Sequence, residues 1–554
     1  MLDDRVSQNE HSTFAYSLLI FILFSALFVL LRSKDPLGVD GAFRCFAVFR
    51  TPQLSFAENN HALYPANVFI WTRLAKLVGF DIGSVQNFYS TVELMNCVAA
   101  AGCLALFFRL SLMATLSKRA ALGITLGLGL SRAFLLHATN ASEPMVAIFW
   151  SFLAIYLAAR CFRTVSRWPA FVSGVLVALA MASYQTTVLL GPVAVLILWR
   201  AAQPRSSSRT IAPKLLNVFS FTAGAFTGCM LIYGCIVRFR LHASAPGTAV
   251  GSVLSGLFHD PGSIAYLGIR SGRLLNLPLG FLRNSYPVLT QFAGIREFLR
   301  GAPLSVIFIF FLLAGFAVLA AYCAIRMTAL WKILEPRTRT GILCGVVGVP
   351  FTIVPLLIWD PQYDKFWIQP LACLIFLLGI SLHVISSRPW IFSRGIALLL
   401  FFGLLFNFGW LVHFHRTSIV EMREAQRLST LVRRGDLVVG NWDGISVLYH
   451  YAWLPPGTKF ISFPSAAIRQ GPQSVVRLQQ SISATLASGG RALFVSLLDE
   501  PKSTWDSFLT LRCGVPYSSF DVYRAHSVPY ATFETRYGRV AVKRLELSVL
   551  SEVR

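Results

Sequence analysis

Asp40 is the residue of this chain best placed to act as a general base. It follows the first long apolar segment, precedes Gly41 and has apolar neighbours on both sides. A carboxylate at the mouth of a membrane cavity is partly desolvated, which raises its pKa and makes it a better base. The alternative is a solvated loop residue that caps a helix beginning at Ala42.

A second candidate group follows in segment 58–65. Glu58, Asn60, His61 and Tyr64 place hydrogen-bonding side chains and an aromatic ring within eight residues, and Pro65 indicates the first turn of a helix. Such side chains suit a polyhydroxylated ligand. The alternative is a capped helix start whose histidine is satisfied by the protein itself.

A third group lies between the third and fourth apolar segments and contains Arg132, His137, Asn140 and Glu143. Titratable groups at membrane depth are costly unless they are paired or functional. Glu143 precedes Pro144 at a helix start, where the helix dipole stabilises a carboxylate. Glu143 is therefore either a second acid of the site or a simple cap.

Four cations could bind a phosphate. Arg270, Arg273 and Arg283 occur in apolar stretches, and Lys365 is the one cation of a short aromatic-rich loop. Guanidinium groups match phosphate oxygens in two-point hydrogen bonds, whereas an ammonium acts as a point charge. Alternatively, all four residues anchor helices at the membrane interface.

The elements that position these residues are membrane-spanning helices. Hydrophobic residues make up 55% and charged residues 13% of the 554 residues, which exceeds the apolar content of soluble domains. About 20 apolar residues cross a bilayer. We therefore predict about eleven spans, reading 170–200 as a tight hairpin rather than one kinked span: 14–32, 88–108, 120–136, 144–160, 170–184, 186–200, 215–236, 303–325, 341–358, 366–386 and 395–414.

Short-loop charges predict the orientation of these spans. Lysine and arginine collect in every second short loop, and the alternate short loops hold only Arg132 and Lys365. The polar segments 33–87, 237–302 and 415–554 then share the external face with the candidate residues. We expect a multi-pass protein of the bacterial inner (plasma) membrane, with its active site on the periplasmic side. Much of the net charge of +24 comes from the cytoplasmic loops, which anionic lipid headgroups also attract, so it does not indicate nucleic-acid binding.

Two domains are predicted. Residues 1–414 form the transmembrane module, whose external loops 33–87 and 237–302 carry interfacial helices such as 68–80. Residues 415–554 form an external α/β domain with buried strands near 436–442, 459–463 and 491–497 and a helix near 474–486. Alternation of strands and helices favours some parallel pairing. No spacing indicates a zinc site, and a disulfide between Cys45 and Cys513 is not expected.

The arrangement resembles the GT-C superfamily of membrane glycosyltransferases, which includes the protein O-mannosyltransferases and the lipid A aminoarabinose transferase. The resemblance is carried by Asp40 after the first span, segment 60–65, Glu143 with Pro144, Lys365 and the C-terminal domain. It implies a GT-C-like fold, Asp40 as catalytic base, a polyprenyl-phosphate sugar as donor and basic loop residues around its phosphate. Gly41 replaces the second acid of the common Asp-Glu pair, so a divalent cation remains an open alternative and no cofactor is assigned.

The sequence therefore predicts a hexosyl or pentosyl transferase that acts, with inversion, on an acceptor hydroxyl of a glycan, lipid or protein. A lipid or oligosaccharide transporter (flippase) of the cell envelope is the main alternative. It predicts paired repeats and broken helices in matching halves, which the sequence does not contain. A non-catalytic scaffold whose C-terminal domain binds an envelope partner is the third.

Overall fold

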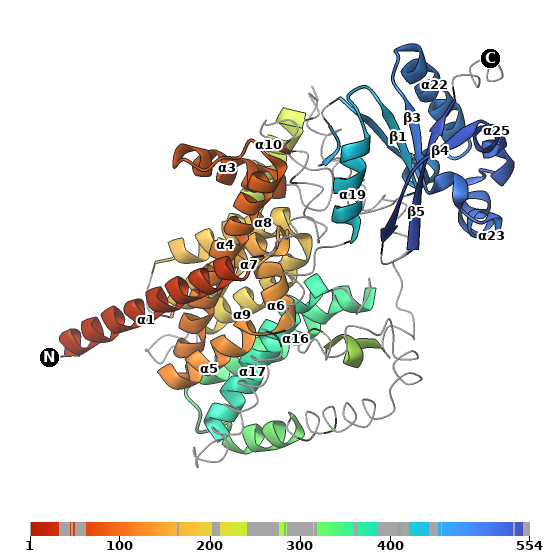
Figure 1. Cartoon of the computed structure of the whole chain (residues 1–554). Helices are drawn as coiled ribbons and strands as arrows, with labels where there is room; N and C mark the ends of the chain where they lie inside the picture. Colours follow the sequence, from red (N-terminus) through yellow and green to blue (C-terminus); the bar gives the residue numbers. More distant parts are fainter. Residues whose placement is uncertain are drawn as a thin grey trace. The chain divides into compact units, whose positions relative to one another are not determined.

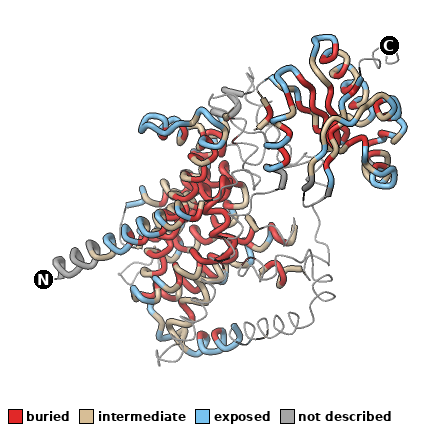
Figure 2. The backbone as a smooth tube through the Cα atoms, viewed as in Figure 1, coloured by how far each residue is buried: buried red, intermediate tan, exposed pale blue. Residues whose placement is uncertain are grey.

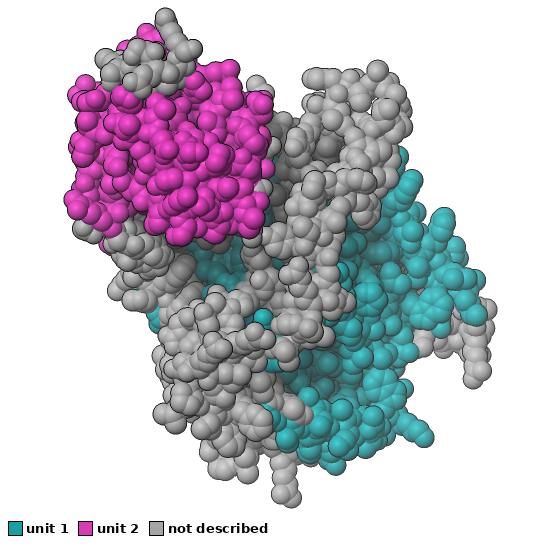
Figure 3. Space-filling model, turned by 90° about the vertical axis from the view of Figure 1, so that its right-hand side faces the viewer, with its two compact units in different colours: residues 1–33, 47–416 teal, residues 34–46, 417–554 magenta. Residues whose placement is uncertain are grey.

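The computed structural model describes part of the chain in two compact units, residues 1–33 with 47–416 and residues 34–46 with 417–554 (Figure 3). The sequence predicts a boundary between residues 414 and 415. The described residues are 2–32, 45, 48–49, 63–162, 166–201, 211–240, 276–281, 284, 314, 318, 320–358, 364–385, 407, 409, 412, 420–441, 453–455, 457–535 and 538–546.

The first unit is a bundle of apolar helices (Figure 1). In its described part, five helical stretches are long and apolar enough to cross a membrane: 12–30, 85–115, 212–234, 336–358 and 364–385. They belong to α1 (Leu2–Leu30), α4 (Val85–Thr115), α10 (Ala212–Arg240), α16 (Pro336–Ile358) and α17 (Ile368–Ile385), the last preceded by η3 (Asp364–Trp367). Shorter apolar helices are α7 (Pro144–Arg160), α8 (Trp168–Ser183) and α9 (Gly191–Ala201). The polytopic helical fold is confirmed, whereas the number of eleven stays a prediction because most of 303–325 and 395–414 lies outside the described residues.

The predicted span 120–136 is not one straight helix. It consists of α5 (Lys118–Gly129) and α6 (Arg132–Ala138), which meet at an angle of 70°. Leu130 and Ser131 form the break, and the hydroxyl of Ser131 donates to the carbonyl of Leu128 at 2.8 Å. Because the chain turns here, Arg132 and His137 lie on a separate short helix rather than at the end of a span.

Close packing of α8 on α10 supports the predicted hairpin at 170–200. A Cβ atom at Gly174 would lie 2.0 Å from the carbonyl oxygen of Phe221, and one at Gly228 would lie 2.8 Å from the Cβ of Ala178. From Gly174 to Ala178 along α8, the contacts move from Phe221 to Gly228 along α10, so α8 and α10 run in the same direction. In a hairpin, α9 runs opposite to α8, to which η1 (Gln185–Leu190) joins it, and α10 then returns in the direction of α8.

Helix α3 (Tyr64–Leu77) has the two faces of an interfacial helix. Val68, Thr72 and Ala75 are buried, whereas Ile70 and Leu74 are each 53% exposed. The pattern agrees with the interfacial helix predicted at 68–80.

The second unit contains a five-stranded sheet of order β2-β1-β3-β5-β4. The parallel strands β1 (Leu437–Gly440), β2 (Lys459–Ser462) and β3 (Ala492–Val495) coincide with the three predicted strands, while β4 (Ser527–Thr535) and β5 (Gly538–Leu545) add an antiparallel hairpin that the sequence analysis missed. Helix α22 (Gln473–Ala487) matches the predicted helix at 474–486.

Apolar side chains cover both faces of this sheet. Leu437, Val439 and Phe494 pack against α21 (Phe463–Gln470), α22 and α25 (Asp521–Ala525), whereas Val438 and Leu493 pack against α19 (Val420–Leu431). Every residue of β1 and β3 is buried, which Figure 2 shows as continuous red tube. Such burial explains why these strands are continuous apolar runs in the sequence.

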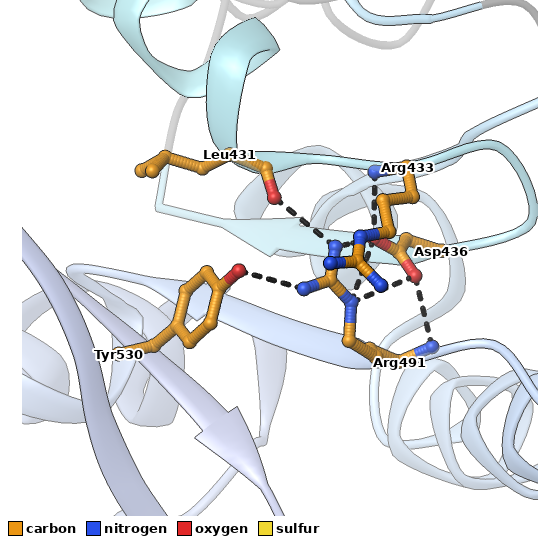
Figure 4. A network of polar contacts seen from close by, with 5 residues as sticks. All are labelled: Leu431, Arg433, Asp436, Arg491 and Tyr530. Atoms are coloured by element: carbon orange, nitrogen blue, oxygen red, sulfur yellow. Dashed lines mark hydrogen bonds and ion pairs between the residues drawn. The ribbon is translucent and has the colours of Figure 1, made fainter.

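A polar network closes one end of the parallel strands (Figure 4). Arg491 Nε donates to Asp436 Oδ2 at 3.1 Å, and its Nη1 donates to the Tyr530 hydroxyl at 2.7 Å. Burial alone would raise the pKa of Asp436, but hydrogen bonds from the Arg491 guanidinium and from the backbone N–H groups of Arg433 and Arg491 outweigh it. The pKa of Asp436 consequently lies below its ordinary value of 3.8.

Candidate active site

The loop between α6 and α7 is held in place by a buried amide of α4. Asn96 Nδ2 donates to the carbonyl oxygens of Asn140 at 2.6 Å and Ser142 at 2.7 Å. The side chain of Asn140 in turn donates to the carbonyl of Leu136 at 2.7 Å. Asn96 therefore has the interior hydrogen-bonding role that is typical of an amide within a span.

His137 and Glu143 are both buried beside this loop. His137 Nδ1 lies 2.6 Å from the Ser142 hydroxyl, and the histidine is 5% exposed. Glu143 is 2% exposed and occupies the N-cap position of α7, but its side chain makes no capping hydrogen bond. Simple capping therefore does not account for Glu143, and its catalytic role stays a prediction.

Arg132 makes the main ionic contact of the cluster. Its Nη1 and Nη2 atoms donate to the two carboxylate oxygens of Asp364, each at 3.0 Å, and Nη1 also donates to Asn284 Oδ1 at 3.2 Å. Arg132 is 5% and Asp364 19% exposed. This two-point pair connects the start of α6 to η3, although 232 residues separate the partners.

Lys365 lies next to this ion pair on η3. Its ammonium group is 5.7 Å from the ring centroid of Phe366. Phe366 and Trp367 are buried, so η3 is packed into the bundle rather than exposed as a loop. The position of Lys365 is thereby coupled to the Arg132–Asp364 pair.

The start of α3 contacts the end of α8. The backbone N–H of Leu63 donates to the carbonyl of Ala182 at 2.9 Å, and Asn67 Nδ2 donates to the hydroxyl of Ser183 at 3.1 Å. Tyr64 is fully buried. Here its ring is part of the packing between α3 and the bundle, and a contact with substrate stays a prediction.

These contacts connect the described candidates at one end of the bundle. Tyr184, which follows α8, stacks on Phe366 of η3 with ring centroids 6.3 Å apart. The end of α8 therefore links the start of α3 to η3, and η3 is linked through Arg132 to α6. Four predicted site residues lie along this chain of contacts: Tyr64, His137, Glu143 and Lys365.

Seven predicted site residues lie outside the described residues: Asp40, Glu58, Asn60, His61, Arg270, Arg273 and Arg283. Two of their sequence neighbours are described at the cluster. Leu63 follows His61 by two positions and is bonded to α8, and Asn284 directly follows Arg283 and is bonded to Arg132.

Asp364 is the partner of Arg132 and was not among the predicted site residues. Two features of the sequence could have indicated this pair. Arg132 is predicted in an external loop, although arginine is typical of cytoplasmic loops, and the acid Asp364 directly precedes Lys365. Within the described ranges, no three His, Cys, Asp or Glu side chains gather closely enough to hold a metal ion. Cys45 and Cys513 are both buried.

Comparisons with known proteins show similarity in structure and none in sequence. No protein-family model matches the sequence, and no curated protein matches it. ArnT from Cupriavidus metallidurans bound to undecaprenyl phosphate is 11% identical, with a TM-score of 0.52 over 98% of this chain and 99% of that chain. The same ArnT in the apo state is 12% identical, with a TM-score of 0.53 over the same shares of both chains.

The oligosaccharyltransferase from Archaeoglobus fulgidus, crystallised in complex with Zn and sulfate, is 10% identical with a TM-score of 0.53. The alignment covers 94% of this chain and 72% of that chain. The match to ArnT extends over nearly the full length of both proteins, including the C-terminal unit. This chain therefore has the fold of the GT-C membrane glycosyltransferases.

Proposed function

We propose that this protein is a membrane glycosyltransferase that moves a sugar from a polyprenyl-phosphate donor to an acceptor hydroxyl on the external face of the membrane. The observation that carries the proposal is the match along nearly the whole chain to ArnT, a protein whose crystal structure holds undecaprenyl phosphate. The buried polar cluster at one end of the bundle supports it, because charges at membrane depth are kept where they are paired or functional.

The proposed reaction is a single displacement at the anomeric carbon. Asp40 takes the proton of the acceptor hydroxyl as its oxygen forms the new bond to the anomeric carbon. The bond between that carbon and the phosphate oxygen breaks, and polyprenyl phosphate leaves with the bonding electrons. One displacement inverts the configuration of the sugar.

Each candidate residue has a role in this reaction. Glu143, buried at the start of α7, is the second acid of the site. Hydrogen-bonding groups from segment 58–64 and from α6 bind the sugar, namely Glu58, Asn60, His61, Tyr64 and His137. Lys365 and the arginines of segment 237–302 hold the donor phosphate.

Within the described part of the chain, no group of His, Cys, Asp or Glu side chains could hold a metal ion. A divalent cation bound near Asp40 is the alternative, since the archaeal oligosaccharyltransferase was crystallised with Zn. A transporter also remains a competing function. It would move the lipid-linked sugar without breaking its bond to phosphate, so free polyprenyl phosphate would not form.

The donor phosphate site is tested by four single substitutions: Arg270→Gln, Arg273→Gln, Arg283→Gln and Lys365→Gln. A hydrogen bond to a charged group contributes roughly 1.5–3 kcal/mol. Loss of a true phosphate ligand should therefore raise the donor KM about tenfold or more, while the acceptor KM barely changes. Lys332→Gln is a matched control, since Lys332 is exposed beside α16. Four variants with unchanged donor kinetics would show that the phosphate site lies elsewhere.

Orientation is tested by labelling engineered cysteines in intact cells. A membrane-impermeant thiol reagent should label a cysteine at Ser503, which is exposed in the C-terminal unit, and should miss one at Ser207. Labelling with the opposite pattern would place the C-terminal unit inside the cell.

A further inference from the structure

An apolar cavity of about 90 Å³, open on one side, lies between helices of the bundle. Five helices contribute to its wall: α4, α7, α9, α16 and α17. Almost all of the lining is apolar, and its members include Phe107, Phe152, Ile197, Cys344, Cys373 and Arg337. Apolar cavities in proteins stay dry and take up apolar ligands.

This cavity is separate from the candidate active site. The site lies at the start of α7, beside Pro144, whereas Ala159 near the end of the same helix lines the cavity. Fifteen residues of α-helix separate the two positions, which corresponds to about 22 Å along the axis. On α16 the lining residues run from Arg337 to Gly345, in the first half of the helix. This half overlaps the end of the basic segment 326–339.

Arg337 gives the cavity one charged end. It lies in the first turn of α16, is half-buried and has no hydrogen bond or ion pair with any described residue. Arg339, two positions later, instead donates to the carbonyl oxygens of Leu334 and Lys332. Arg337 is therefore a guanidinium that borders an apolar cavity without an acidic partner in the described protein.

We propose that this cavity holds a short segment of an acyl chain of an anionic phospholipid, whose phosphate pairs with Arg337. The apolar wall matches the chain, and the guanidinium matches the phosphate oxygens. Basic pockets between membrane helices on the lysine- and arginine-rich side bind anionic lipid headgroups in this way. The donor lipid is a poorer occupant, because its phosphate would lie about 22 Å from the proposed transfer site.

The test measures lipid binding by the full-length protein in detergent from which lipid has been removed. Phosphatidylglycerol is titrated and its binding is followed by native mass spectrometry, with phosphatidylcholine as the neutral lipid. The wild type should prefer phosphatidylglycerol, and Arg337→Gln should weaken its apparent Kd about tenfold or more because a charge-assisted contact is lost. Lys332→Gln, an exposed lysine at the same end of the bundle, should bind as the wild type does.

A second variant tests the cavity itself. Ala159→Leu adds three carbon atoms at a buried lining position. Phosphatidylglycerol should raise the Tm of the wild type but not that of Ala159→Leu. The proposal is overturned if Arg337→Gln and Lys332→Gln bind phosphatidylglycerol equally well, or if undecaprenyl phosphate displaces it from the wild type at equal concentration. The Arg337 measurement decides the question even if Ala159→Leu does not fold.

Discussion

Replacement of Asp364 by asparagine should loosen the end of the bundle that carries the candidate site. The substitution preserves the shape of the side chain and removes its charge. In the wild type, both carboxylate oxygens accept hydrogen bonds of 3.0 Å from Arg132. Asparagine offers one acceptor oxygen and an amide that cannot accept, so Arg132 loses half of this two-point contact.

The burial of the pair sets the magnitude. Arg132 is only 5% exposed, so water cannot replace the lost carboxylate, and Asp364 is 19% exposed. Breaking a buried ion pair by removing one partner costs ~3–5 kcal/mol. In Asp364→Asn, Arg132 keeps its hydrogen bond to Asn284 and gains one to the new amide oxygen. The expected loss of stability therefore lies at the lower end of this range, about 3 kcal/mol. Because η3 also holds Lys365, the donor KM should rise with the loss of stability.

The free energy of unfolding is measured by SDS titration in mixed micelles for the wild type, Asp364→Asn, Arg132→Gln and the double variant. The double variant should be little less stable than either single variant, since both remove the same interaction. Glu335→Gln, an exposed acid beside α16, should change stability by less than about 0.5 kcal/mol. Additive losses from Asp364→Asn and Arg132→Gln would refute the reasoning.

Two further predictions concern packing and pH. Asp436→Asn should destabilise the C-terminal unit by about 3 kcal/mol at pH 7, whereas Asp521→Asn, at an exposed pair, should cost no more than about 1 kcal/mol. The pKa of Asp436 is lower in the folded protein than in the unfolded chain, so its contribution to the free energy of unfolding is complete above the unfolded value near 3.8. This contribution is lost as the pH falls through the folded pKa. Urea titrations of the wild type and of Asp436→Asn should therefore converge at acid pH. Gly224→Ala should cost about 1–3 kcal/mol, because its Cβ would lie 2.0 Å from a carbonyl oxygen of α8. Gly123→Ala has open space around it and should be neutral or slightly stabilising in SDS titration; equal effects of the two alanines would contradict the close helix contact.

Local patterns in the sequence predicted the elements well. The apolar runs of β1 and β3 are buried on both faces, which explains why they were recognisable without their neighbours. The two faces of α3 follow from the helical spacing of Ile70 and Leu74 on its exposed side. In contrast, the hairpin of β4 and β5 carries alternating polar and apolar residues with Pro529 inside β4, a weaker signal that was overlooked.

Long-range features could not be predicted in the same way. Periodicity detects neither the 70° turn at Ser131 nor the partner of Arg132, which lies 232 residues away in the sequence. Burial alone also does not separate a catalytic acid from a structural one. Glu143 is almost fully buried without capping α7, and its catalytic role stays a prediction.

The most direct test of the proposed function is release of polyprenyl phosphate from a radiolabelled lipid-linked sugar by the purified protein supplied with a membrane extract as acceptor source. We predict that the wild type releases polyprenyl phosphate in step with sugar transfer, and that Asp40→Asn, folded as judged by its Tm, is slower by a factor of ~10²–10⁴ as expected for loss of a general base. Release by Asp40→Asn at the rate of the wild type would contradict the role of Asp40. Transport of the intact donor without any release would contradict the glycosyltransferase function itself.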